Sequence, residues 1–269
     1  MSPSGAGQFE KHQSVISAKR SSTDFTPVSY FTLKDGESAR VRFLEQGENL
    51  TWAISHRIKT PGLQWPQDVI CLDQDDEGTS CPACQSDIKE IRSRSTKGYV
   101  NLIWRGTEES PYSRAPVYKK NDKGFVEKST NGQKVIVALE DSVWMWKCSK
   151  TVFEQILTKD KVYKGVMSRD FLISRKGAGL ENTMYAIEPA VIDGGPEPLT
   201  VADQNLVQGK FDVVKLTTPG TYEEMVALLN GQGNIAQNSP QGYQPVGIVP
   251  DQSDVFNGGQ PMRSSAFSK

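Results

Sequence analysis

Four side chains of the kind that bind metal ions lie close together in this chain: His56, Cys71, Cys81 and Cys84. They follow the pattern H-x14-C-x9-C-x2-C, although the whole chain contains only two histidines and four cysteines. Zn²⁺ prefers thiolate and imidazole ligands in a tetrahedral arrangement, and four protein ligands are typical of a structural site. Folding must bring such ligands together, so metal binding stabilises the local fold. The sequence therefore predicts one structural zinc ion.

Two other uses of the Cys81-x2-Cys84 pair have to be weighed against zinc. A redox-active dithiol usually accompanies a βαβ pattern, which does not surround this pair, and it would leave His56 and Cys71 without a role. A disulfide requires an oxidising compartment. The polar N-terminal sequence lacks the apolar stretch of a secretory signal. We therefore expect a reduced, cytosolic protein that holds zinc.

The ligand pattern does not match a catalytic zinc site. A catalytic zinc keeps one coordination position open for water, whereas four protein ligands close that position. Zinc deaminases carry H-x-E and P-C-x-x-C, but Arg57 and Ile58 follow His56, and Pro82 lies inside the Cys-x2-Cys pair. The sequence also lacks the HExxH, GxSxG, Walker and dinucleotide-binding motifs. We expect no enzymatic activity. Cys148 follows an apolar segment, and we expect it to be a buried strand residue rather than a further ligand.

Composition divides the chain into a body and three polar parts. We expect a flexible leader at residues 1–26, a body at 27–190, an acidic linker with a short helix at 191–230, and a disordered tail at 231–269. Residues 191–254 carry two basic and eight acidic side chains, although the net charge of the whole chain is only −1. No stretch approaches the about 18 apolar residues of a membrane span, so we expect no membrane partner.

The body has the pattern of short β-strands separated by turns. In residues 40–44, for example, Arg40 and Arg42 alternate with Val41 and Phe43 on opposite faces. Strands are predicted at residues 30–33, 40–44, 51–58, 99–105, 135–139 and 143–147, and a hairpin is predicted to join 171–175 to 183–187. The run at 135–139 is continuously apolar, which predicts a strand buried on both faces.

Helical patterns are fewer. The body has one clear helix at residues 149–158, which Ser149 can cap. Shorter helical segments are predicted at 85–96 and 222–229. Many short strands with one body helix predict a mostly β protein, an OB-fold-like barrel with a zinc subdomain inserted at about residues 56–97.

Aromatic and basic side chains are interleaved through the middle of the chain. An OB-fold binds single-stranded nucleic acid by stacking bases on aromatic rings and attracting phosphates to Lys and Arg. Tyr99 and Arg105 share the strand face opposite Trp104, which we expect in the core. Trp144 has the pattern of either a core or a base-stacking residue. The candidate nucleic-acid-binding residues are Arg42, Arg57, Lys59, Tyr99, Arg105, Tyr112, Arg114, Tyr118, Lys119 and Trp144.

The spacing of the four ligands resembles that of the zinc-containing single-stranded-DNA-binding proteins of tailed bacteriophages, the helix-destabilising proteins of the T-even type. The motif F-x-L-K-D-G-E at residues 31–37 and the segment 171–185, with Arg175-Lys176-Gly177 inside it, support the resemblance. The resemblance covers about residues 20–190. It implies an OB-fold with a zinc subdomain that coats single-stranded DNA cooperatively during replication, recombination and repair, in the cytoplasm of an infected bacterial host.

The resemblance also implies two further contacts. Members of this family self-associate through a basic stretch near the N-terminus, which Lys19 and Arg20, followed by Ser and Thr, resemble. They recruit replication and recombination proteins through an acidic C-terminal region, which residues 191–254 resemble, although this chain ends in Lys269. The alternative is a zinc-stabilised protein-interaction or virion component that does not bind nucleic acid.

Overall fold

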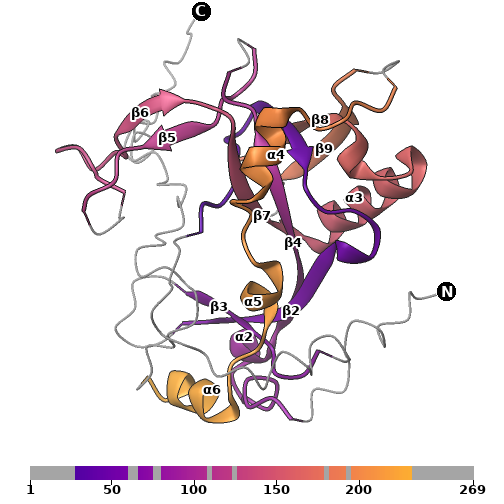
Figure 1. Ribbon diagram of the computed structural model, residues 1–269. Coiled ribbons are helices and arrows are strands. Elements are labelled where there is room, and N and C mark those ends of the chain that lie inside the picture. The colour runs from indigo at the N-terminus through magenta and orange to yellow at the C-terminus, as the bar shows by residue number, and fades with distance from the viewer. Residues whose placement is uncertain are drawn as a thin grey trace, which may run out of the picture. The chain divides into compact units, whose positions relative to one another are not determined.

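The computed structural model describes residues 28–59, 66–74, 80–107, 111–122, 126–178, 182–191 and 195–231. These residues form a mostly β protein with one seven-stranded antiparallel sheet, a separate two-stranded sheet and several short helices (Figure 1). The predicted mostly β class is confirmed. The strands of the large sheet do not close into a barrel, so the structure does not establish the predicted OB-fold-like barrel.

The large sheet has the order β3-β2-β4-β1-β8-β9, and β7 pairs with β4. Its strands are β1 (Ser38–Phe43), β2 (Thr51–Ile58), β3 (Gln67–Ile70), β4 (Arg94–Trp104), β7 (Ser142–Ser149), β8 (Asp170–Lys176) and β9 (Met184–Pro189). The predicted strand at 51–58 and the predicted 171–187 hairpin are confirmed. Of the segment predicted at 30–33, only Tyr30 forms a bridge, to Met145.

The long strand β4 organises this sheet because it pairs with three others. Its first half pairs with β2 and its second half with β1, so β1 and β2 run in line along one edge of β4. Strand β7 pairs along the other edge. The sheet thereby forks into a β2–β3 wing and a β1–β8–β9 wing. The four predicted metal ligands belong to the β2–β3 wing or follow it.

Aromatic side chains fill the main core between β1, β4 and β7. The ring of Phe31 meets those of Trp104 and Trp146 edge-on at 5.0 and 5.6 Å between centroids, and Trp104 meets Trp144 at 5.2 Å. Edge-to-face contacts of this kind are favourable for aromatic quadrupoles. The prediction that Trp104 is a core residue is confirmed.

Helix α3 (Lys150–Tyr163) covers one side of this core. Val152, Phe153 and Ile156 are its buried residues, and the hydroxyl of Ser149 accepts a hydrogen bond from the N–H of Val152 at the first turn. The predicted helix and its cap are confirmed. The helix continues beyond the predicted residue 158 until Lys164, which adopts a left-handed conformation with φ of 53°.

Two predictions near the metal ligands are wrong in detail. The helix predicted at residues 85–96 is only the single turn α2 (Lys89–Arg92), because β4 begins at Arg94. No strand was predicted between residues 58 and 99, but β3 lies there and pairs with β2. This pairing supplies hydrogen-bond partners to the edge of β2 that β4 leaves free.

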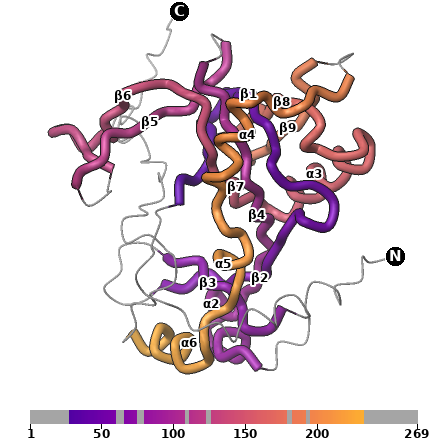
Figure 2. The backbone as a smooth tube through the Cα atoms, viewed as in Figure 1, coloured from indigo at the N-terminus to yellow at the C-terminus, as the bar shows by residue number. Residues whose placement is uncertain are grey.

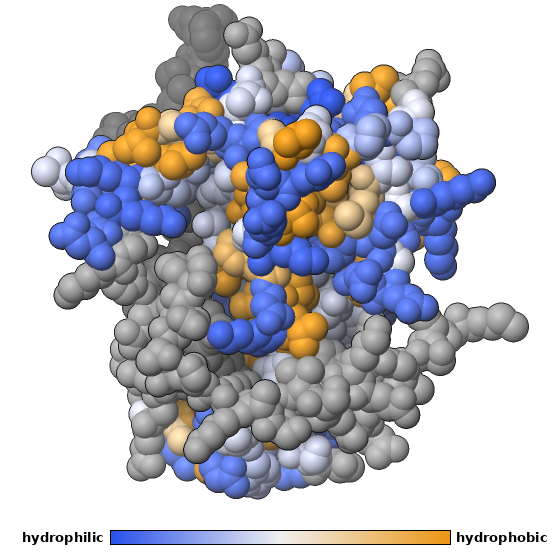
Figure 3. Space-filling view, viewed as in Figure 1, coloured by the Kyte–Doolittle hydropathy of each residue, from blue (hydrophilic) through white to orange (hydrophobic). Residues whose placement is uncertain are grey.

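Residues 105–141 leave the sheet between Trp104 and Ser142, which pair with each other. They include the two-stranded sheet of β5 (Pro116–Tyr118) and β6 (Ile136–Leu139). The prediction that the 135–139 strand is buried on both faces is wrong, because Ile136 and Val137 are 55% and 59% exposed. Strand β6 pairs with β5 alone among the described residues. Figure 3 shows apolar surface over this hairpin.

The packed body continues past residue 190, where the sequence predicted that it ends. Helices α4 (Val201–Val207), α5 (Val213–Thr217) and α6 (Tyr222–Leu229) follow one another along the sheet (Figure 2). Val213 joins a buried cluster with Tyr99 and Met145, and Met225 and Leu228 join one around the metal ligands. The predicted acidic linker is therefore part of the fold, because its short helices bury apolar faces. The helix predicted at 222–229 is confirmed.

The predicted leader at 1–26 and, apart from Gly231, the predicted tail at 231–269 lie outside the described residues. Among the residues that the structure describes, no helix is both long enough and apolar enough to cross a membrane.

Candidate metal centre and neighbouring basic cluster

The β2–β3 hairpin and the turn after it bring the four predicted ligands together. His56 lies in β2, Cys71 directly follows β3, and Cys81 and Cys84 flank a turn. One ligand atom from each side chain lies within 4.8 Å of all the others. The group can therefore hold one metal ion.

The distances between the ligand atoms fit zinc. Sγ of Cys71 and Sγ of Cys84 are 3.6 Å apart, and Nε2 of His56 lies 3.6 Å from Sγ of Cys81 and 3.4 Å from Sγ of Cys84. Zinc binds sulfur at about 2.3 Å and imidazole nitrogen at about 2.0 Å, which places tetrahedral ligands about 3.5–3.8 Å apart. The donor set of three thiols and one imidazole is also the one that zinc prefers.

A hydrogen bond outside the ligand set orients the imidazole. Nδ1 of His56 lies 2.8 Å from the carbonyl oxygen of Ile91, in α2. Because a carbonyl can only accept, Nδ1 carries the proton and Nε2 keeps its lone pair for the metal. The short helix α2 thus fixes both the tautomer and the direction of the ring.

The ligands are also enclosed by apolar side chains. His56, Cys71 and Cys81 are buried and Cys84 is half-buried. Their cluster includes Val69 from β3 and Met225 and Leu228 from α6. A site closed by four ligands and this packing has the features of a structural rather than a catalytic centre.

Crowding of the thiols also perturbs their protonation. A hydrogen bond from Cys71 lowers the pKa of Cys81, whereas the same bond and burial raise the pKa of Cys71. A divalent cation among these groups favours the thiolate form of each ligand. Cys148, by contrast, lies in β7 outside the ligand group, and burial raises its pKa to about 12. Its prediction as a buried strand residue is confirmed.

The opposite face of the same hairpin carries charge. Neighbouring residues in a strand point to opposite faces, so Arg57 lies on the face that His56 does not use. Arg57 pairs across the strands with Asp68, just as His56 pairs with Val69. A metal that holds His56 therefore also steadies the backbone that presents Arg57 and Asp68.

Two lysines from other strands approach Asp68 on this face. Nζ of Lys147, in β7, lies 2.7 Å from Oδ2 of Asp68 and 5.7 Å from the ring centroid of Tyr99. Burial alone raises the pKa of Asp68, but the positive charges of Lys147, Lys97 and Arg57 outweigh burial and lower it. We call Arg57, Asp68, Lys97 and Lys147 the Asp68 cluster.

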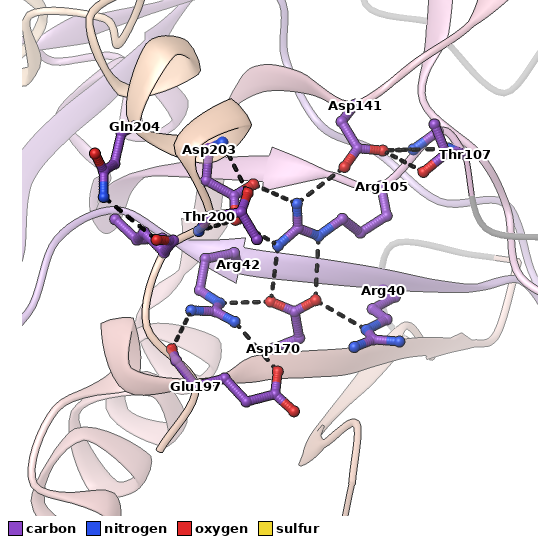
Figure 4. A network of polar contacts seen from close by, with 12 residues as sticks. Arg40, Arg42, Arg105, Thr107, Asp141, Asp170, Glu197, Thr200, Asp203 and Gln204 are labelled. Carbon is purple, nitrogen blue, oxygen red and sulfur yellow. Dashed lines mark hydrogen bonds and ion pairs between the residues drawn. The ribbon is translucent and has the colours of Figure 1, made fainter.

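Two of the predicted nucleic-acid-binding arginines are instead held by carboxylates in an internal network (Figure 4), in which Arg42 is buried and Arg105 half-buried. Arg42 is 2% exposed and bonds to Asp170 and to the carbonyl oxygen of Glu197. Arg105 bonds to Asp170, Asp141 and Asp203 of α4. Both guanidinium groups are already paired with carboxylates of the protein. The prediction that these two arginines bind nucleic acid is therefore corrected: they bind internal carboxylates.

Two predicted aromatic residues are also buried. Tyr99 is 3% exposed because the segment around Val213 packs over its strand face. Trp144 is 7% exposed and packs against Trp104 in the main core. A buried ring cannot stack on a base without local opening, so neither residue is an accessible stacking platform. The sequence pattern placed Tyr99 on the correct face but did not show that α5 covers this face.

The remaining predicted residues are accessible. Arg57, Lys59, Arg114 and Lys119 are exposed, and Tyr112 and Tyr118 are half-buried. They fall into two places: Arg57 and Lys59 lie at the end of β2, and the others lie in or before the β5–β6 hairpin. Tyr118 packs against Trp144, and Nζ of Lys134 lies 5.0 Å from the Tyr118 ring centroid. The predicted self-association residues Lys19 and Arg20 lie outside the described residues.

Sequence reasoning missed Lys97, Asp68 and Lys147 as site residues. A signal for Lys97 was available, since it shares a strand face with Tyr99, two residues away. No local pattern links Asp68 to Lys147, because they lie 79 residues apart. No protein-family model matches this sequence, and no curated protein matches it significantly.

Proposed function

We propose that the protein binds and coats single-stranded DNA, and that a structural zinc ion steadies the wing that contacts the strand. The observation that carries this proposal is the Asp68 cluster beside the metal centre. Three basic side chains from β2, β4 and β7 gather there around one carboxylate. Phosphates of a nucleic-acid backbone are attracted by such a cluster in a salt-dependent manner.

The layout of β2 supports the link between metal and binding. His56 faces the thiols while Arg57 belongs to the Asp68 cluster, and exposed Lys59 directly follows the strand. Zinc would act as a scaffold, and no step of bond making or breaking is assigned to it. The fold is proposed to be a relative of the OB-fold whose sheet remains open, and the role is proposed in phage replication, recombination and repair in the host cytoplasm. Self-association through Lys19 and Arg20 and recruitment of replication proteins by residues 191–254 are part of this proposal.

The test is a titration of the zinc-loaded protein with fluorescently labelled oligo(dT), a duplex and an RNA strand of equal length, at several salt concentrations. We expect a preference for single strands and an affinity that falls steeply with salt. Arg57→Gln and Lys97→Gln should each weaken binding and reduce the salt slope by about 1. Lys161→Gln, which removes an exposed lysine on α3, is the matched control and should change neither. Absence of binding at low salt would refute the proposal.

A second titration tests the scaffold role. After the metal is removed with a chelator, we expect weaker binding of oligo(dT), restored by added zinc. Equal affinity of the metal-free and zinc-loaded protein would show that zinc does not support binding.

The alternative function is a zinc-stabilised protein-interaction or virion component. The exposed apolar side chains of β6 favour it, because Ile136 and Val137 together offer apolar surface that a protein partner could bury. The same titrations separate the two functions. If the protein is an interaction component, the wild type should bind none of the nucleic acids at low salt. If it binds single-stranded DNA as we propose, the double variant Ile136→Ser/Val137→Ser should keep the oligo(dT) affinity of the wild type.

A further inference from the structure

The ion pair between Asp68 and Lys147 joins two strands that are not neighbours in the sheet. Strand β3 carries Asp68 and strand β7 carries Lys147, and β2 and β4 lie between them. Strands in a flat sheet are about 4.8 Å apart, so these two would be separated by about 14 Å. Their charged atoms are nevertheless 2.7 Å apart. Because the Lys147 and Asp68 side chains together are shorter than that separation, the sheet must curl, and the ion pair connects the metal-binding wing to β7 across the concave side.

The pair is accessible from solvent and surrounded by excess positive charge. The side chains of Lys147 and Asp68 are 22% and 33% exposed. Arg57, directly opposite Asp68 on β2, is exposed, and Lys97 is half-buried. Three cations thus share one carboxylate, which leaves the cluster able to accept a second anion.

A carboxylate and a phosphodiester resemble each other as binding partners for a lysine side chain. Both offer anionic oxygens that accept short charge-assisted hydrogen bonds from an ammonium group. The 2.7 Å bond from Lys147 to Asp68 has the length of such a contact. An anion that approaches Lys147 must either displace Asp68 or share the lysine with it.

We infer that Asp68 occupies the position of a backbone phosphate and competes with single-stranded DNA for Lys147, Lys97 and Arg57. The inference rests on the proposed function and assigns Lys147 as a phosphate-binding residue. Asp68 contacts no DNA in this arrangement. It lowers the affinity for any single strand and makes binding depend on breaking the Asp68–Lys147 contact between β3 and β7.

The first test compares Asp68→Asn with wild type in oligo(dT) titrations at several salt concentrations. Removal of the competing charge should raise the affinity about three- to tenfold at moderate salt and steepen the salt slope by up to about 1. Asp87→Asn is the matched control, because Asp87 is an exposed carboxylate close to the metal ligands in sequence and its loss changes the net charge equally. Its affinity should rise much less.

The second test is a double-mutant cycle with Lys147→Gln. Lys147→Gln alone should weaken binding and lower the salt slope by about 1. In the Lys147→Gln background, Asp68→Asn should raise the affinity distinctly less than it does in wild type, because the principal cation for which Asp68 and the DNA strand compete is gone. Zinc content and the unfolding temperature of each variant show whether it is folded, and Asp68→Ser replaces Asp68→Asn if the latter loses zinc.

Two results would overturn the inference while leaving the proposed function intact. In the first, wild type binds oligo(dT), but Asp68→Asn changes the affinity no more than Asp87→Asn does. In the second, Asp68→Asn raises the affinity equally with and without Lys147. If wild type itself fails to bind at low salt, the proposed function is refuted and the inference is refuted with it.

Discussion

The carboxylate of Glu45 accepts hydrogen bonds from both the backbone N–H and the side-chain amide of Asn101, at 2.7 and 2.8 Å. Glu45 lies in the segment between β1 and β2, where the edge of β4 has no strand partner among the residues that the structure describes. The carboxylate therefore supplies the acceptor that the ladder lacks at this point. The amide of Asn101 also donates to the carbonyl of Phe211 and accepts from its N–H, both at 2.9 Å. One pair of residues thus completes the hydrogen bonding at this edge of β4 and anchors the segment before α5.

We predict that Asn101→Leu detaches this segment. The substitution leaves the buried Glu45 carboxylate without its side-chain donor and removes both bonds to Phe211, so the free energy of unfolding should fall by about 2–4 kcal/mol. Hydrogen exchange should accelerate at residues 211–217. Asn49→Leu, at an exposed position, is the control and should leave exchange in α5 unchanged.

The buried carboxylate of Asp170 should contribute strongly to stability, because three arginines bond to it. Asp170→Asn should lower the free energy of unfolding by about 3–5 kcal/mol, measured by urea denaturation at neutral pH, since it leaves buried guanidinium charge uncompensated. Asp122→Asn, at an exposed turn, should have an effect below about 0.5 kcal/mol. A similar small effect of both substitutions would contradict the structural importance of this network.

The contribution of Asp170 to the free energy of unfolding should also depend on pH. Burial alone raises its pKa, but hydrogen bonds and positive charge from Arg105 and Arg42 outweigh burial and lower it. A carboxylate with a lowered pKa in the folded state stabilises above the unfolded pKa of about 3.9, and this stabilisation is lost as pH falls through the folded pKa. The difference in stability between wild type and Asp170→Asn should therefore be constant above about pH 5 and shrink below about pH 4. A difference that grows on acidification would be inconsistent with this sign.

Metal binding should require the four-ligand group and not Cys148. We expect one zinc ion per purified wild-type chain by elemental analysis, and loss of this ion in Cys81→Ser, together with proteolytic sensitivity of the β2–β3 wing. Cys148→Ser changes a buried cysteine outside the group and should retain one zinc per chain. Retention of zinc by Cys81→Ser would mean that the ligand set is different.

A substitution at Gly98 tests how closely α3 packs on β4. A Cβ at this position would lie 2.3 Å from Cδ2 of Phe153 and 2.9 Å from Sγ of Cys148. Gly98→Ala should therefore lower the free energy of unfolding by about 1–3 kcal/mol through overpacking. At Gly195 an added Cβ meets no atom of the described part of the chain within 4 Å, so Gly195→Ala serves as the control. Equal denaturation midpoints of the two variants would show that Phe153 can move aside.

Sequence patterns predicted elements whose signals are local. The alternation in residues 40–44 and the cap at Ser149 indicate a strand and a helix that the structure contains, because neighbouring residues decide both elements. The apolar run at 135–139 was predicted to be a buried strand, yet β6 lies in an exposed hairpin. Burial depends on what packs against a strand, and an apolar run contains no information about its neighbours.

For the candidate site, the sequence by itself determined the four metal ligands, because their rarity and spacing are visible without the fold. Only the tertiary structure decided which charged groups are free to bind. Arg42 and Arg105 are occupied by Asp170 and Asp203, which lie between 65 and 128 residues away along the chain. Lys147 meets Asp68 only because the sheet curls. Electrostatic partners are set by distance in space, and in this protein folding joins strands that the sequence keeps far apart.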